Sequence, residues 1–520
     1  MITTLESYVR GSWLAPADEG TVLHDAATGA PIARISARPL NYGPVVDHAR
    51  EVGGPALRAL TFHRRAEMLK ALGKHLSARI PEFTELSLST GATRRDAVVD
   101  IDGGVNALFV YGSKGVKQLP DSNVLSDGDF EPLSKSGAFG VQHILTPRPG
   151  VAVQINAFNF PVWGMLEKLA PALLAGVPSI VKPASQTAYL TAMVFREIVA
   201  SRILPEGAVQ LVCARPDGLI DQLGPQDSLA VTGSRDTAAA LRRHDAVVAN
   251  AVRYTAEADS LNSSVLGPDV SPGDPEFDVF VRMVATEMTQ KAGQKCTAIR
   301  RVFVPAERLD AVQDALTARL AKVQVGNPGA EDTRMGALAS QAQRDDVRRS
   351  VDTLAAAAKV VFGDAHGRPA NFSADADFDA GAFMSPVLLR ADDPDREELH
   401  SVEAFGPVAT LMPYDGLEQA AELIARGRGS LVASVVTGDE GFAAGLVAAT
   451  APWHGRMLVV DRDNAGDSTG HGAALAQAVH GGPGRAGGGE ELGGLRALPH
   501  YLQRSAVQGG PQLLGALVGR

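Results

Sequence analysis

The sequence predicts an α/β protein with two parallel-sheet domains of the Rossmann type, and three observations support this prediction. The chain has 520 residues, of which 45% are hydrophobic and 21% charged, so it is long enough for two or three domains with sizeable cores. From about Val151, short apolar runs alternate with helix-like segments, and a second alternating series begins after Cys296. Such alternation is typical of βαβ units, which form a parallel sheet with helices on both faces.

The first predicted series follows a mainly helical region. Residues 63–80 carry apolar side chains at helical spacing, after a short strand-like lead. A helix is also expected over residues 185–203, where Ser185 or Thr187 would be the N-cap. The expected strands of this series lie at residues 151–157, 178–184, 207–214, 228–234 and 246–258.

The second series ends in a glycine-rich segment, residues 480–494. This segment contains Gly-x-Gly-x-x-Gly at Gly482, Gly484 and Gly487. The Rossmann fingerprint needs a preceding strand and a following helix within the first βαβ unit, so we expect instead a tight loop that lines a site. The expected strands of this series lie at residues 300–304, 359–363, 385–390, 408–414 and 430–438, with helices at 308–323 and 416–427.

The composition excludes several classes of protein. A net charge of −10 argues against nucleic acid as a partner, because phosphate backbones need a basic surface. Two cysteines cannot form a disulfide framework and are typical of a reducing compartment. The longest apolar stretch, residues 169–181, is too short for a membrane span, and the N-terminus shows no secretory signal. We therefore expect a soluble cytoplasmic protein, and the scattered histidines predict no metal site.

One of the two cysteines lies in an unusual context. Cys296 belongs to "KAGQKCTAIRRVFV", residues 291–304, where Lys295 precedes it and Lys291 is one turn away. Nearby positive charge favours the thiolate, which is the nucleophilic form. The alternative is a small packed residue at the start of a strand. Cys213, in "LVCARP", is expected to be a buried strand residue.

Other polar residues are predicted to follow strands. In "VTGSRDTAAALRR", Thr232, Gly233 and Ser234 come where a strand leads into a helix, whose N-terminus can bind an anion or can simply be capped. Lys182 would lie at the carboxyl edge of the second strand, where ligands bind in such sheets. Glu257 ends another strand and is a candidate general base, or else a surface glutamate.

The ordered set of motifs resembles the aldehyde dehydrogenase superfamily over nearly the whole chain. No single motif is specific enough to identify a protein family, but the complete set in this order is specific. In chain order the motifs are "YVRGSW", "AFNFPVWG", "VKPAS", "VTGS", Glu257, "GQKC", "EAFGP" and "HGGPGRAGGGEELGG".

The resemblance implies roles for individual residues. Cys296 would be the nucleophile, and the Asn159 amide with the Cys296 backbone N–H would stabilise the oxyanion. After hydride transfer to a nicotinamide cofactor, Glu257 would activate the water that hydrolyses the thioester. The residues implied in cofactor binding are Lys182 and Ser185 at the adenosine ribose, Thr232, Gly233 and Ser234 at the pyrophosphate, Glu403 at the nicotinamide ribose, and Phe158 and Phe405 along the site.

Departures from the common motifs indicate a substrate and a cofactor. The usual Glu-Leu-Gly-Gly-Lys is Glu-Ala-Asp-Ser-Leu here, and Gly484 replaces the lysine of the glycine loop. This combination resembles the branch that oxidises acyl-CoA semialdehydes, such as 3,4-dehydroadipyl-CoA semialdehyde, in aromatic degradation. Some members of that branch carry an extra hydratase domain, which we do not expect here. Ser185 replaces the glutamate of NAD-preferring relatives, so we expect NADP, with NAD less favoured.

The resemblance also implies an organisation and leaves alternatives. The expected parts are a dinucleotide-binding domain at residues 1–125 and 150–258, a catalytic domain at 259–478, and oligomerisation segments at 126–149 and 495–520 that would form a homodimer. One alternative is a CoA-acylating aldehyde dehydrogenase, in which CoA replaces water. Another is a cofactor-free cysteine acyltransferase, which leaves the cofactor motifs unexplained. A non-enzymatic scaffold would not need Asn159, Glu257 and Cys296 in this order.

Overall fold

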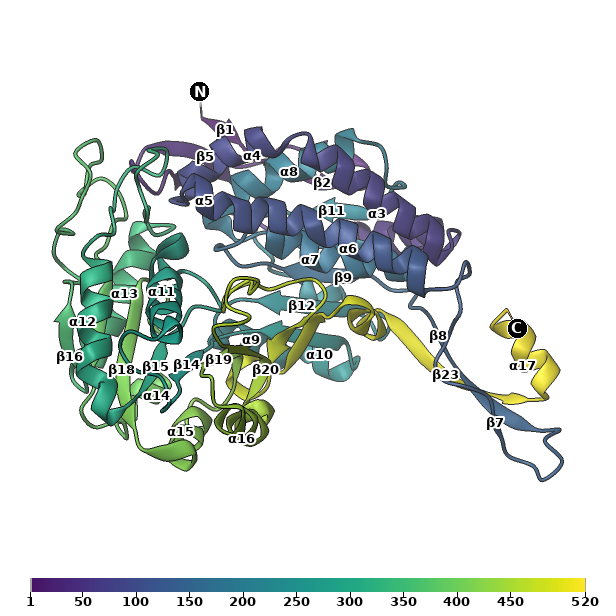
Figure 1. Ribbon diagram of the computed structural model, residues 1–520. Coiled ribbons are helices and arrows are strands. Elements are labelled where there is room, and N and C mark those ends of the chain that lie inside the picture. The colour runs from purple at the N-terminus through teal and green to yellow at the C-terminus, as the bar shows by residue number, and fades with distance from the viewer. Residues whose placement is uncertain (1, 520) are drawn as a thin grey trace.

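The N-terminal half of the molecule is built around the first of two large sheets (Figure 1). The structure is a computed structural model that describes residues 2–519. Its seven strands run in the order β13-β12-β9-β10-β11-β2-β3, and the first five are parallel. All five strands expected from the first series are therefore present. They are β9 (Ala152–Ile155), β10 (Ser179–Lys182), β11 (Val209–Leu211), β12 (Ser228–Thr232) and β13 (Arg253–Glu257), with an antiparallel hairpin of β2 (Ser7–Val9) and β3 (Ser12–Leu14) at the edge.

Alternation of side chains along these strands gives the sheet two apolar faces. In β10, Val181 belongs to one core cluster and its neighbour Ile180 to the other. The Val181 face is covered by α3 (Phe62–Ser77), α6 (Gly103–Gln118), α7 (Trp163–Ala175) and α8 (Ala188–Ala200). The opposite face packs against α9 (Arg235–Arg242) and α10 (Asp245–Ala249). Burial on both faces explains why these strands are continuously apolar in the sequence.

The second sheet also has seven strands, in the order β16-β17-β18-β15-β14-β19-β20. Helices α13 (Gln341–Ala355), α15 (Gly416–Ala425) and α16 (Glu440–Thr450) cover one face, and α11 (Pro275–Thr289) and α12 (Leu309–Leu320) cover the other. The predicted α/β class with two parallel-sheet units is confirmed. The strands are β14 (Ser263–Leu266), β15 (Arg301–Pro305), β16 (Lys359–Phe362), β17 (Val387–Arg390), β18 (Val408–Tyr414), β19 (Ser430–Val436) and β20 (His454–Val460).

Several elements differ from the sequence prediction. β14 and β20 were not expected; β14 is polar in sequence, but the buried Ser434 hydroxyl bonds to Ser264 at 2.9 Å. β16 pairs antiparallel to β17, unlike the other strands of this sheet. Neither Ser185 nor Thr187 caps α8 through its side chain, because the Thr187 hydroxyl donates to the Phe158 carbonyl instead.

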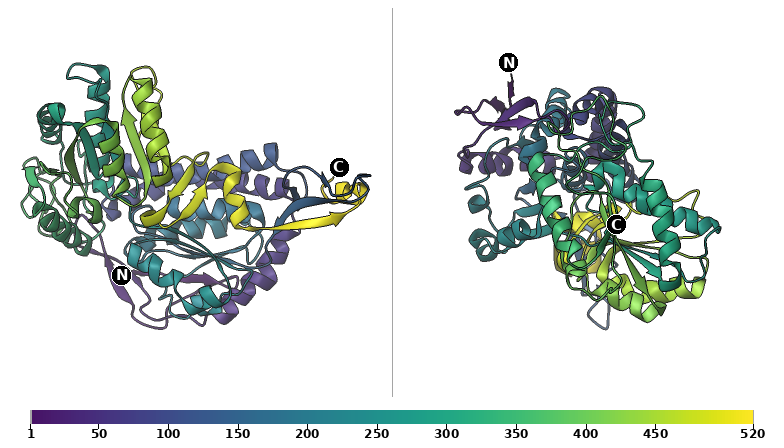
Figure 2. Two further views of the ribbon diagram at one scale, coloured as in Figure 1. Left: turned by 90° about the horizontal axis from the view of Figure 1, so that it is seen from below. Right: turned by 90° about the vertical axis from the view of Figure 1, so that its left-hand side faces the viewer.

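The chain after β20 returns to the first sheet and then leaves it. The hairpin of β21 (Val479–Gly482) and β22 (Gly489–Leu492) carries the predicted glycine-rich loop. Beyond it, β23 (Leu502–Gly509) pairs with β8 (Gly140–Pro147) in an arm that projects from the body and ends near α17 (Pro511–Leu517), as Figures 1 and 2 show. Among the described residues, no helix has the length and apolar character needed to cross a membrane.

Candidate active site

The candidate site lies where the carboxyl ends of the first sheet meet the loop before β15. Glu257 is the last residue of β13 and Thr232 the last residue of β12, and the two are register partners. The glycine loop closes the site from a third direction. At Gly487 the backbone φ is +106° and an added Cβ would lie 2.3 Å from the Ala256 carbonyl oxygen, so only glycine lets this loop approach β13 so closely.

The loop that carries Cys296 is fixed by its backbone. Lys291, Ala292 and Gly293 all have positive φ, and the Lys291 N–H donates to the buried carboxylate of Asp96 at 2.9 Å. The Asn262 side-chain amide donates to the Cys296 carbonyl at 2.7 Å. A strained segment persists only where its surroundings hold it, and these bonds provide that support.

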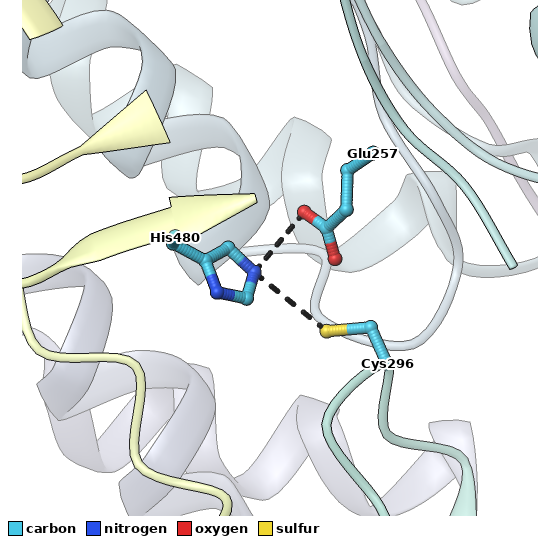
Figure 3. A group of neighbouring side chains, drawn as sticks. All are labelled: Glu257, Cys296 and His480. Carbon is cyan, nitrogen blue, oxygen red and sulfur yellow. Dashed lines mark hydrogen bonds and ion pairs between the residues drawn. The ribbon is translucent and has the colours of Figure 1, made fainter. Parts of the chain in front are cut away.

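Cys296, Glu257 and His480 form one cluster (Figure 3). The His480 Nε2 atom lies 3.2 Å from a Glu257 carboxylate oxygen and 3.8 Å from the Cys296 sulfur. Glu257 and His480 are buried, whereas Cys296 is partly accessible. The ring of Trp163, in α7, meets the His480 ring edge-on at 5.2 Å between centroids. The imidazole is therefore held between a carboxylate and a thiol. It can accept a proton from the Cys296 thiol while it interacts with the Glu257 carboxylate.

The charges in this cluster differ from the sequence expectation. Burial raises the pKa of the Cys296 thiol well above its ordinary value, and the carboxylate of Glu257 raises it further. The lysines expected to favour the thiolate bond elsewhere: Lys295 pairs with Glu287 at 2.9 Å, and Lys291 lies 3.9 Å from Asp100. The prediction that these lysines activate the resting thiol is therefore wrong, and the thiol needs a base to lose its proton.

Glu257 is ionised in the resting cluster. Burial opposes its charge, but the charge and hydrogen bond of His480, together with the charge of Lys168, outweigh burial and lower its pKa to about 2. Lys168 lies in α7, with its Nζ atom 2.7 Å from Glu167 and 2.9 Å from Glu491. Burial holds the pKa of Glu167 well above its ordinary value, and carboxylate oxygens of Glu167, Glu257 and Glu491 lie within 4.8 Å of one another.

Three residues expected at a nicotinamide cofactor lie together near Cys296. The rings of Phe158 and Phe405 meet edge-on at 5.8 Å, and the Arg300 guanidinium lies over the Phe405 ring at 5.5 Å. Glu403 lies 4.0 Å from Arg300. Burial raises the pKa of Glu403 to about 7, and Glu403 in turn contributes to the raised pKa of Cys296.

The remaining expected cofactor residues follow the strands of the first sheet. Lys182 is the last residue of β10 and donates to the Pro183 carbonyl at 2.6 Å. The Thr232 hydroxyl is buried without a partner among the described residues. Ser234 caps α9, since its hydroxyl accepts from the Thr237 N–H. Beside it, an added Cβ at Gly233 would meet no atom within 4 Å, so open space lies at the start of α9.

The chain matches a known protein family over nearly its whole length. The model of the aldehyde dehydrogenase family matches residues 13–505. The chain belongs to the aldehyde dehydrogenase family. The resemblance inferred from the ordered motifs is thereby confirmed, and the protein is an oxidoreductase that acts on aldehydes with a nicotinamide cofactor.

One curated relative and one solved structure cover most of this aldehyde dehydrogenase, and a second relative covers about a third of it. The 3,4-dehydroadipyl-CoA semialdehyde dehydrogenase of Aromatoleum evansii is 44% identical over 481 residues, which are 92% of this chain and 93% of that protein. Protein MaoC of Klebsiella aerogenes is 48% identical over 184 residues, which are 35% of this chain and 52% of that protein. A betaine aldehyde dehydrogenase from Staphylococcus aureus, solved with NAD⁺, superimposes with a TM-score of 0.83 at 21% identity, covering 97% of this chain and 95% of that one.

Sequence reasoning missed three residues of the aldehyde dehydrogenase site as chemical groups. Glu167 and Lys168 are adjacent charges inside the apolar helix "WGMLEKLAPALLA", and this interruption is the signal that could have revealed them. His480 was noted only as the first residue of the glycine-rich segment. Asn159, which was expected, is buried in the loop between β9 and α7.

The same cluster bears on the question of a metal site. Glutamate, cysteine and histidine also ligate zinc, and the ligand atoms of Glu257, Cys296 and His480 lie within 4.8 Å of one another, so the absence of a metal stays a prediction.

Proposed function

We propose that this aldehyde dehydrogenase oxidises the semialdehyde of an acyl-CoA, such as 3,4-dehydroadipyl-CoA semialdehyde, to the carboxylic acid in aromatic degradation. The observation that carries the chemistry is the buried cluster of Cys296, Glu257 and His480, which combines a thiol, a carboxylate and a proton acceptor. The full-length likeness to a dehydrogenase named for that substrate supports the substrate.

The residues divide the chemistry into two stages. In the first, the His480 imidazole in its neutral form accepts the proton of the Cys296 thiol, and the sulfur attacks the aldehyde carbon. The Asn159 amide and the Cys296 backbone N–H stabilise the oxyanion. In the second stage, once the thiohemiacetal has lost its hydride to the bound cofactor, the group on Cys296 is a thioester, and Glu257 would take a proton from the water that attacks it. The carboxylic acid is released, and the leaving thiolate recovers the proton held by His480. The carboxylate of Glu491, which lies within 4.8 Å of Glu257 and is paired with Lys168, can accept the proton from Glu257.

The group of Phe158, Phe405 and Glu403 fits a nicotinamide cofactor, which supplies the hydride acceptor when bound. Open space beside Gly233 and the unpartnered Thr232 hydroxyl, among the described residues, suit a pyrophosphate near the N-terminus of α9. Glu403 would accept from the hydroxyls of the nicotinamide ribose, and Phe158 and Phe405 would border the ring.

A comparison of substrates tests the proposed function. We expect kcat/KM for a CoA-linked semialdehyde to exceed that for a free aldehyde of the same acyl length, with the free acid as product and no need for added CoA. The CoA-acylating alternative predicts instead that turnover requires CoA and yields a thioester. Equal efficiency with both aldehydes would contradict the substrate proposal.

The cofactor is proposed to be NADP because of Ser185. This residue is exposed, and its hydroxyl has no hydrogen-bond partner within residues 2–519, so it is free to donate to a 2′-phosphate near Lys182. We expect Ser185→Glu to shift the ratio of catalytic efficiencies toward NAD about tenfold or more. Like charges a few ångströms apart cost roughly 1 to 4 kcal/mol near a surface, and each 1.4 kcal/mol is about tenfold.

Gln186→Glu is the matched control, since Gln186 is the exposed neighbour and lines a different cavity. It adds the same charge and should leave the ratio nearly unchanged. A wild-type enzyme that favours NAD, or equal shifts in the two variants, would show that position 185 does not set the choice.

We propose that the protein forms a cytoplasmic homodimer through its arm. The arm exposes large apolar side chains at Leu133, Phe139 and Leu513, which a partner would cover. The two cysteines are unpaired, which suits a reducing compartment. Sedimentation velocity measures the assembly, and a monomer at micromolar concentration would contradict the dimer.

A further inference from the structure

A large basic groove lies between a short N-terminal helix and the helices α11 and α12, which cover one face of the second sheet. We use the term basic groove for the cavity of about 640 Å³ around the side chains of Arg95, Arg319, Lys322 and Arg334. Arg95 belongs to the short helix α5 (Arg94–Ala97), and Arg319 to the end of α12. Four cations from three separate parts of the chain therefore surround one cavity in a protein whose net charge is −10.

These four cations are not neutralised by the fold. Within residues 2–519, none of them forms an ion pair with a carboxylate, and Arg334 donates only to the Glu331 backbone carbonyl. Two acids line the cavity: Asp96 is buried and accepts bonds from Thr93 and Lys291, whereas Asp278 is exposed. A cleft lined by charges of one sign attracts a ligand of the opposite sign.

The basic groove continues toward the nucleophile. A second cavity of about 310 Å³ shares Thr286 and Gln290 with the groove and is lined further in by Lys295. Lys295 directly precedes Cys296, and its Nζ atom bonds to the Gln290 side chain at 2.7 Å. None of the residues proposed to hold the nicotinamide cofactor lines either cavity. The two cavities thus lie side by side along the end of α11, and the inner one reaches Lys295, the residue next to Cys296.

We propose that the basic groove binds the phosphate groups of the CoA portion of the substrate, an inference that rests on the proposed function. CoA carries its pyrophosphate and 3′-phosphate at one end and the acyl group at the other, joined by a long flexible arm. Arginine guanidinium groups bind phosphate oxygens in pairs of hydrogen bonds. The phosphates would be held at the surface by Arg95, Arg319 and Lys322, while the arm passes Thr286 and Gln290 and the aldehyde reaches Cys296.

The test removes the charge of the groove without touching the catalytic cluster. In the triple variant Arg95→Gln, Arg319→Gln, Lys322→Gln, we expect KM for the CoA-linked semialdehyde to rise roughly 10- to 100-fold with kcat nearly unchanged. Kinetics with a free aldehyde of the same acyl length should stay the same. The control triple Arg38→Gln, Lys74→Gln, Lys359→Gln removes three exposed cations that also lack ion pairs among the described residues, and it should keep the wild-type KM.

Calorimetric titration with CoA, pantetheine and inorganic phosphate gives a readout that does not depend on activity. CoA should bind to the wild type and the control triple, and bind at least tenfold more weakly to the groove triple. Binding of pantetheine as tight as that of CoA, or equal KM in the two triples, would overturn the groove assignment. Inorganic phosphate that competes with CoA at equal concentration would make the groove a general anion site and would also overturn it. A wild type that neither prefers the CoA-linked aldehyde nor binds CoA would instead contradict the proposed function.

Discussion

Cys296→Ala should abolish aldehyde oxidation while leaving the binding of the nicotinamide cofactor nearly intact. The variant removes the only thiol beside Glu257 and His480, and no other nucleophile of the cluster can form a thioester. We expect kcat to fall by at least about 10⁴-fold, as it does when other enzymes lose a catalytic nucleophile. The measurement is steady-state reduction of the cofactor, together with cofactor binding followed by fluorescence quenching.

Cys213→Ala is the matched control, because Cys213 is the other cysteine of the chain. It is buried, and burial raises its pKa to about 12, so it is neither accessible nor ionised at neutral pH. This variant should retain wild-type turnover, and iodoacetamide should label the wild type at Cys296 alone. Appreciable turnover by Cys296→Ala would sink the assignment of the nucleophile.

The sequence was sufficient to predict the fold class and the reactive side chains that lie in the ordered motifs. Alternating strands and helices predicted both sheets, because strands buried on both faces are continuously apolar. β14 was missed because two serines interrupt its apolar pattern, and no sequence pattern shows that the partner of Ser264 is Ser434. Cys296 and Glu257 were found by motif, and their proximity follows from the carboxyl edge of the first sheet.

Electrostatic partners were harder to predict, because they meet only in the folded chain. Lys291 and Lys295 precede Cys296 in the sequence and suggested an activated thiolate. In the structure, however, Lys291 pairs with Asp100 and Lys295 pairs with Glu287. His480 lies 184 positions from Cys296 along the chain and was not assigned a chemical role. The sequence therefore predicted that the Cys296 sulfur attacks. The group that accepts the thiol proton could be identified only from the folded structure.

Glu257→Gln and His480→Gln should separate the two stages of the reaction. Glutamine keeps the size and hydrogen bonding of Glu257 but cannot accept a proton from water, so acylation of Cys296 should proceed and hydrolysis should stall. We expect one equivalent of reduced cofactor in a rapid burst, followed by a steady-state rate about 10² to 10⁴ times below that of the wild type. Glu276→Gln is the control, since Glu276 is also a buried, ion-paired glutamate, and it should show normal turnover.

His480→Gln should show the reverse pattern, with a slow burst and no accumulated thioester. Because burial and Glu257 raise the pKa of Cys296, the thiolate fraction without an imidazole is small near neutral pH and grows as pH rises. The burst rate of His480→Gln should therefore increase about tenfold per pH unit, until the thiol pKa is reached. In Glu257→Gln, the group whose pKa lies near 2 is gone, but the imidazole remains 3.8 Å from the sulfur, so the burst should persist at neutral pH. Loss of the burst in Glu257→Gln, with a normal burst in His480→Gln, would mean that Glu257 and not His480 deprotonates Cys296.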